Sequence, residues 1–160
     1  MASGDAETWF VDTNVLVYAN VAQAPLHTVA LTRLQEVART GAPLWISRQV
    51  LREYLAVVTR PQHWSAPQPL VRALARVRYF QRRFQVADET AVVTACLLTL
   101  LRTIPAGGAQ IHDANIVATM QAYGVQRVLT ENAADFARFA GVITIVPLVV
   151  PDSSPPAPPA

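Results

Sequence analysis

The chain has 160 residues, 52% of them hydrophobic, which is enough for one substantial core and fits a single domain better than two. Its one cysteine, Cys96, excludes an internal disulfide, so a reducing cytoplasm is the expected environment. All thirteen basic residues are arginine, and the lack of lysine excludes a P-loop and a Schiff-base mechanism and disfavours a phospho-receiver site.

The first half of the chain predicts strands that alternate with helices. Residues 9–11 form an apolar run, which predicts a strand with a helix directly after it. Apolar residues at spacings of three and four predict an amphipathic helix over residues 26–38, ended by Gly41. A second strand over residues 43–47 and a helix over about 49–59 follow.

The second half of the chain continues the alternation after a proline-punctuated loop over residues 61–69. The elements expected there are an arginine-rich helix to about residue 83, helices over about 88–102 and 111–124, and strands over 127–130 and 142–146. Short strands that alternate with helices indicate an α/β fold around a parallel sheet.

The ends of the chain and its apolar runs indicate a protein that is neither exported nor bound to a membrane. Residues 1–7 are polar and acidic, unlike a signal peptide. The longest apolar run, residues 91–101, is well short of the roughly 20 residues that span a bilayer. Residues 148–160 are rich in proline and poor in apolar side chains, so we expect a disordered tail.

Charge is distributed unevenly along the chain. Residues 33–83 carry ten arginines against two glutamates, whereas the remainder carries three arginines against nine acids. A basic flank beside an acidic centre suits a protein that attracts a phosphate backbone and holds a metal ion. A solvated helical surface is the alternative interpretation of the same arginines.

Two aspartates stand where a functional role and a capping role are both open. Asp12 follows an apolar strand directly, at the edge where open α/β sheets bind ligands, but it also suits a helix N-cap. Asp113 falls on the apolar face of its predicted helix, near Met120, where an unpaired carboxylate is costly. It also lies in the first helical turn, where an acid complements the helix dipole.

Two further acids carry a weaker signal on their own. Glu53 lies at the rim of an apolar helical stripe, and a solvated residue paired with an arginine is the ordinary interpretation. Asp135 and Asn132 are both suitable caps for a short helix that carries Phe136 and Phe139.

The ordered set of these residues resembles a known family. The segments are Phe10-Val-Asp12-Thr-Asn14-Val-Leu, Glu53-Tyr54-Leu55, His112-Asp113-Ala114 and Leu129-Thr130-Glu-Asn132-Ala-Ala-Asp135-Phe136. Together they are similar to PIN domains, particularly VapC-type toxin ribonucleases, over roughly residues 8–147. The resemblance implies an α/β fold, a PIN-like single domain with a central parallel sheet flanked by helices.

The resemblance also implies a metal-dependent ribonuclease and its site. Asp12, Glu53, Asp113 and Asp135 would be the catalytic and metal-binding residues, with Asp12 and Asp113 the chief ligands. Thr13, Thr130 and Asn132 would orient them. Many family members have aspartate at the position of Asn132, so either Asn132 or Asp135 fills the fourth place.

The chemistry of the donors favours Mg²⁺ or Mn²⁺. Converging carboxylates are hard oxygen ligands, and the chain offers no zinc pattern of cysteines and histidines. A dehalogenase-type phosphatase also begins with an aspartate after a strand, but its general acid two residues later is replaced here by Asn14.

The partners implied by the resemblance are an RNA substrate, a cognate antitoxin and a second copy in a homodimer. Transfer, ribosomal and messenger RNA all remain open as substrates. The alternative function is a catalytically inactive PIN-like module that binds RNA or acts as a scaffold, because a fold often outlives its activity.

Overall fold

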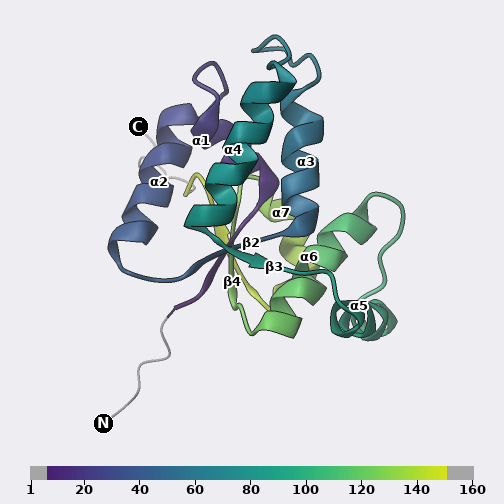
Figure 1. Ribbon diagram of the computed structural model, residues 1–160. Helices are drawn as coiled ribbons and strands as arrows, with labels where there is room; N and C mark the ends of the chain where they lie inside the picture. The colour runs from purple at the N-terminus through teal and green to yellow at the C-terminus, as the bar shows by residue number, and fades with distance from the viewer. Residues whose placement is uncertain (1–6, 151–160) are drawn as a thin grey trace, which may run out of the picture.

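The computed structural model describes residues 7–150, which form five parallel strands with helices on both sides of the sheet (Figure 1). The strand order is β3-β2-β1-β4-β5. The strands are β1 (Trp9–Val11), β2 (Leu44–Ser47), β3 (Gln85–Ala87), β4 (Arg127–Thr130) and β5 (Thr144–Pro147). The α/β fold with a central parallel sheet, predicted from the sequence, is therefore confirmed.

Seven α-helices and one 3-10 turn, η1, accompany the strands within residues 7–150. They are α1 (Thr13–Asn20), α2 (His27–Arg39), α3 (Arg48–Val58), α4 (Leu70–Arg83), α5 (Ala91–Thr103), α6 (Gln110–Tyr123), α7 (Ala133–Phe136) and η1 (Ala137–Phe139). Each predicted helix is present to within about three residues at either end. Helix α5 packs on α6 at the outside of the molecule (Figure 1). No helix within the described range is long and apolar enough to cross a membrane.

Strand β1 lies at the centre of the sheet, and all three of its residues are buried. It pairs with β2 on one side and with β4 on the other. The chain adds β2 and β3 on one side before it crosses to add β4 and β5 on the other. The gap beyond the carboxyl ends of β1 and β4 is thus a topological switch point, where open α/β sheets bind ligands.

Two strand predictions need correction. Strand β3 was not expected, because three residues between two long helices show too little alternation to predict a strand. Strand β5 begins at Thr144, two residues later than predicted, because the N–H groups of Val142 and Ile143 bond back to the carbonyl of Phe139 in a turn.

The packed chain extends to Leu148, the first residue of the predicted tail. Leu148 is 1% exposed, and its N–H donates to the carbonyl of Thr130 at 2.8 Å. The predicted disorder otherwise falls mostly on residues 151–160, which lie outside the described residues.

Candidate functional site

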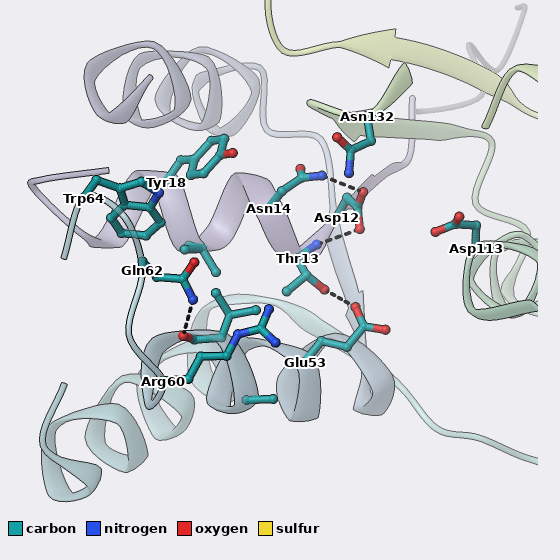
Figure 2. A pocket seen from close by; sticks show the side chains of 13 residues that line it. Asp12, Thr13, Asn14, Tyr18, Glu53, Arg60, Gln62, Trp64, Asp113 and Asn132 are labelled. Carbon is teal, nitrogen blue, oxygen red and sulfur yellow. Dashed lines mark hydrogen bonds between the residues drawn. The ribbon is translucent and has the colours of Figure 1, made fainter. Parts of the chain in front are cut away.

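A pocket of about 440 Å³ opens at the switch point of the sheet (Figure 2). Asp12 at the end of β1, Glu53 on α3 and Asp113 on α6 contribute carboxylates to its wall. Thr13 and Asn132 line the same pocket. Residues distant in sequence meet here because β1 ends, and α3 and α6 begin, at this edge of the parallel sheet.

The Asp12 carboxylate is buried and held by three hydrogen bonds. Its Oδ1 accepts from the backbone N of Thr13 at 2.8 Å, and its Oδ2 accepts from Asn14 Nδ2 at 3.1 Å and Thr130 Oγ1 at 2.7 Å. Burial raises its pKa to about 6, helped by the charges of Glu53 and Asp113 and opposed by the Thr130 and Thr13 hydrogen bonds. Asp12 thus caps α1 and faces the pocket at once.

Glu53 is held at the pocket wall by two donors. Thr13 Oγ1 donates to its Oε2 at 2.6 Å, and Gln49 Nε2 donates to its Oε1 at 2.7 Å. The arginine next to it, Arg52, pairs with Glu89 at 3.0 Å instead. Glu53 is therefore part of a network inside the pocket and not a solvated residue of an ion pair.

Asp113 is half-buried in the first turn of α6, with its carboxylate turned toward Asp12 (Figure 2). Within residues 7–150 no hydrogen-bond donor reaches this carboxylate. Desolvation raises its pKa, and the negative charges of Asp135 and Glu53 raise it further. A carboxylate that is desolvated, repelled and without a donor favours any cation that enters the pocket.

Asp135 lies beside the pocket rather than in its wall. Its side chain, on the short helix α7, is exposed and borders a neighbouring hollow together with Glu131 and Asn132. Asn132 borders both cavities, so of the two candidates for the fourth place it is the one that lines the main pocket. Asp135 still acts on the site through its charge, which raises the pKa of Asp113.

Thr130 does not line the pocket but holds the Asp12 carboxylate from the end of β4. It is fully buried at the end of β4, where its Oγ1 donates to Asp12 and accepts from the backbone N of Asn132 at 3.0 Å. Thr13 has a matching role between Asp12 and Glu53. Both threonines thus donate hydrogen bonds to carboxylates of the pocket.

Gln49 is a site residue that the sequence reasoning missed. It is 5% exposed, and its Nε2 donates both to Glu53 and to the carbonyl of His112, the latter at 3.0 Å. Its Oε1 accepts from Asn115 Nδ2 at 2.8 Å. One buried amide thereby connects α3 to the turn of α6 that carries Asp113. The available signal was its position four residues before Glu53, on the same helical face.

The far end of the pocket was also missed. Tyr18 on α1 and Arg60, Gln62 and Trp64 from the loop after α3 line it (Figure 2). These residues belong to no motif in the sequence. Only the folded chain brings them to the carboxylates.

The three carboxylates of the pocket lack basic partners. The salt bridges within residues 7–150 use Glu7, Glu36, Asp88 and Glu89, not Asp12, Glu53 or Asp113. In the same range no three Asp, Glu, His or Cys side chains lie close enough to hold an ion as they stand. The carboxylates thus converge without closing a coordination shell, and their hard oxygens suit Mg²⁺ or Mn²⁺.

A model of the PIN domain matches residues 9–142, which is most of the chain. This chain belongs to the PIN-domain family. The match spans all four segments that suggested the family, so that prediction is confirmed. No curated protein matches the chain by sequence.

Solved structures share the fold of this PIN domain. VapBC2 from Rickettsia felis, in complex with a promoter DNA fragment, superposes with a TM-score of 0.65 at 19% identity, over 88% of this chain and 98% of that one. VapC20 from Mycobacterium tuberculosis, described as a toxin that cleaves the sarcin-ricin loop, gives 0.63 at 22% identity, over 88% and 100%. A toxin-antitoxin complex from Klebsiella pneumoniae gives 0.62 at 19% identity, over 89% and 98%.

Stability of this PIN domain without metal is expected to increase as the pH falls. The folded chain holds the Asp12 proton with a pKa of about 6, against 3.8 for an ordinary aspartate, so it binds more protons than the unfolded chain between these values. The penalty of the buried charge is fully present above pH 6 and is relieved as the pH falls through 6 toward 4. Urea unfolding in EDTA should show roughly 1–2 kcal/mol more stability at pH 5 than at pH 8.

The matched control for this pH dependence is Asp12→Asn, whose side chain does not titrate. Its unfolding free energy should change less between pH 8 and pH 5 than that of the unmodified chain. Equal slopes in both proteins would contradict the assignment of the titration to Asp12.

Proposed function

We propose that this PIN domain is a ribonuclease that hydrolyses RNA phosphodiester bonds with Mg²⁺ or Mn²⁺, and that it is the toxin of a toxin-antitoxin pair. The observation that carries the proposal is the pocket itself. In a family-typical fold, Asp12, Glu53 and Asp113 line one cavity at the switch point of the sheet, without basic partners in the described range. Such a set is costly unless a cation shares it.

Asp12 and Asp113 would be the chief metal ligands. Glu53 and Asp135 would complete the site directly or through water, and Asn132 is the alternative to Asp135 in the fourth place. When bound, the ion would lower the pKa of an attacking water and neutralise charge on the phosphate. Thr13 and Thr130 would keep the oxygens of Asp12 and Glu53 in place through the hydrogen bonds described above.

Glu53 is the best-placed group to position the attacking water or take its proton. Both of its oxygens are already held, one by Thr13 and one by Gln49, so its orientation is set before a substrate arrives. Each oxygen keeps a further lone pair for water. In-line attack on phosphorus would then break the bond to the ribose oxygen on the opposite side, which would take up a proton and leave as a hydroxyl.

The arginine-rich helix α4 supplies a surface for the RNA backbone. Its exposed arginines are Arg72, Arg76, Arg78, Arg82 and Arg83. None of them forms a salt bridge within residues 7–150, so their charges are available to phosphates. Contacts of this kind position RNA without selecting its sequence.

The toxin assignment and its partners rest on the solved structures. VapC20 is described as a toxin, and the Klebsiella structure as a toxin-antitoxin complex. By analogy, this chain would act in the cytoplasm as a homodimer and be inhibited by a cognate antitoxin. Co-expression with the product of a neighbouring short gene should yield a stable complex without ribonuclease activity.

Incubation of the purified chain with total RNA tests the ribonuclease proposal. With Mg²⁺ or Mn²⁺ we expect discrete fragments whose mapped 5′ ends identify the substrate among transfer, ribosomal and messenger RNA. EDTA should abolish them. Intact RNA in every lane, from folded protein free of antitoxin, would contradict the proposal and favour the inactive RNA-binding module.

A further inference from the structure

The pocket continues well beyond the carboxylates. Its volume of about 440 Å³ lies within the roughly 300–1,000 Å³ of sites that enclose a small molecule. At one end are the three acids, and at the other are Tyr18, Arg60 and Trp64 (Figure 2). Binding of a metal ion would explain only the end with the three acids. The end with Tyr18, Arg60 and Trp64 requires a ligand of its own.

Two aromatic rings form the far end. Tyr18 and Trp64 are 6.4 Å apart between ring centroids, with their planes at 80°. In this edge-to-face arrangement the edge of one ring lies against one face of the other. The two rings have four faces in all, and the contact between them covers only that one. Both side chains are only partly buried, and both line the pocket. A flat aromatic ligand can therefore stack on a face that the neighbouring ring leaves uncovered.

The loop that carries Trp64 is fixed to the end of α3. Gln62 and Ser65 close a tight turn through reciprocal backbone bonds, in which the Gln62 N–H donates at 2.9 Å and the Ser65 N–H at 3.4 Å. The Gln62 side chain donates from Nε2 to the carbonyl of Val57 at 3.0 Å. Trp64 is thus presented by an ordered turn, which lowers the entropy cost of stacking a ligand on it.

Polar groups at this end are left available. Arg60 forms no salt bridge and no side-chain hydrogen bond within residues 7–150, and its guanidinium extends into the pocket between Trp64 and Glu53 (Figure 2). Gln62 Oε1 accepts no hydrogen bond in the same range. A ligand suited to this end has an aromatic face, a negative charge near Arg60 and a donor for Gln62. An unpaired nucleotide of RNA has all three, whereas a base in a duplex already has both faces covered by its neighbours.

We propose that Tyr18, Arg60 and Trp64 form a subsite that takes one unpaired RNA base next to the cleaved phosphate. Trp64 and Tyr18 hold the base by stacking, and Arg60 holds its phosphate. The inference rests on the proposed function, since it names the form of RNA that the pocket accepts. In this proposal the loop after α3 selects single-stranded RNA, whereas the carboxylates at the other end of the pocket serve the cleavage reaction.

Binding of two labelled RNA octamers in EDTA tests the subsite without cleavage. One octamer is single-stranded oligoadenylate, and the other has the same sugar-phosphate backbone without bases. The unmodified chain should bind oligoadenylate more tightly, by roughly 5- to 150-fold, the range that stacking of one base provides. Trp64→Leu, which keeps apolar bulk but removes the ring, should lose most of this preference. Trp64→Phe should retain it, and His63→Ala, at the exposed neighbouring position, should leave it unchanged.

Arg60→Gln should weaken both octamers alike and reduce the slope of log affinity against log salt by about 0.7, the value for one phosphate contact to a single strand. Arg102→Gln, which removes the same charge from the exposed end of α5 outside the pocket, is its matched control. The subsite would be overturned if the unmodified chain bound both octamers equally, or bound neither measurably. A preference for oligoadenylate that is unchanged in Trp64→Leu would also overturn it.

The same preparations, assayed with Mg²⁺ or Mn²⁺, separate this inference from the proposed function. Cleavage by a chain that does not distinguish the octamers would refute the subsite and leave the ribonuclease intact. A Trp64-dependent preference for bases without any metal-dependent cleavage would support the subsite and refute the ribonuclease.

Discussion

Asp113→Asn is expected to reduce RNA cleavage by at least about 100-fold while leaving the metal-free protein as stable as before or more so. Loss of a group that supports a metal ligand typically costs 10- to 100-fold, and loss of a chief ligand should cost more. The stability expectation follows from the pKa of Asp113, which desolvation and the charges of Asp135 and Glu53 raise. A neutral amide of the same shape removes that repulsion.

Three measurements check the Asp113 prediction together. They are the rate of fragment formation, the melting temperature in EDTA, and the rise of that temperature on addition of Mg²⁺ or Mn²⁺, which reports binding to the folded state. The rise should be present in the unmodified chain and absent from Asp113→Asn. Asp88→Asn is the matched control, because Asp88 is an exposed acid outside the pocket.

One outcome would refute the role of Asp113 in cleavage, and another would refute the expectation for its stability. Full cleavage by Asp113→Asn would show that its carboxylate is not needed for the reaction. A clear fall in its melting temperature in EDTA would show that the carboxylate supports the fold, so that lost activity would carry no information on metal binding.

The parts of the site that local patterns encode were predicted from the sequence. A buried strand that ends in a polar residue places Asp12 at the carboxyl edge of the sheet, and helical periodicity places Asp113 on the inner face of its helix. Glu53 had no such signal. Periodicity placed it only at the rim of α3, and the order of the family segments was needed to select it.

The parts that were missed depend on contacts between distant segments. Tyr18 and Trp64 are 46 positions apart in the sequence. The prolines within residues 61–69 predict a loop, but they do not predict the direction in which the loop presents Trp64. Strand β3 exists because β2 offers it a partner, since its three residues have no pattern of their own. Asp135 entered the prediction through the family segment, but the short helix α7 turns it out of the pocket wall.

Gln49→Leu is expected to lower both the stability and the activity of this PIN domain. The leucine leaves Asn115 Nδ2 and the carbonyl of His112 without the partners that Gln49 provides, which should cost about 1–3 kcal/mol of unfolding free energy. It also frees one oxygen of Glu53, so cleavage should fall by roughly 10- to 100-fold. Urea unfolding and cleavage rates measure the two effects, and Gln121→Leu, at an exposed position of α6, should change neither appreciably.

A double-mutant cycle with Glu53→Gln separates positioning from a general loss of structure. If Gln49 acts on catalysis by orienting Glu53, then Gln49→Leu should reduce cleavage far less in the Glu53→Gln background than in the unmodified chain. Its cost in stability should largely persist there, because the bonds to Asn115 and His112 do not involve Glu53. Additive losses of activity would instead mean that Gln49 serves the reaction only by joining α3 to α6, with Asp113 rather than Glu53 as the residue it places.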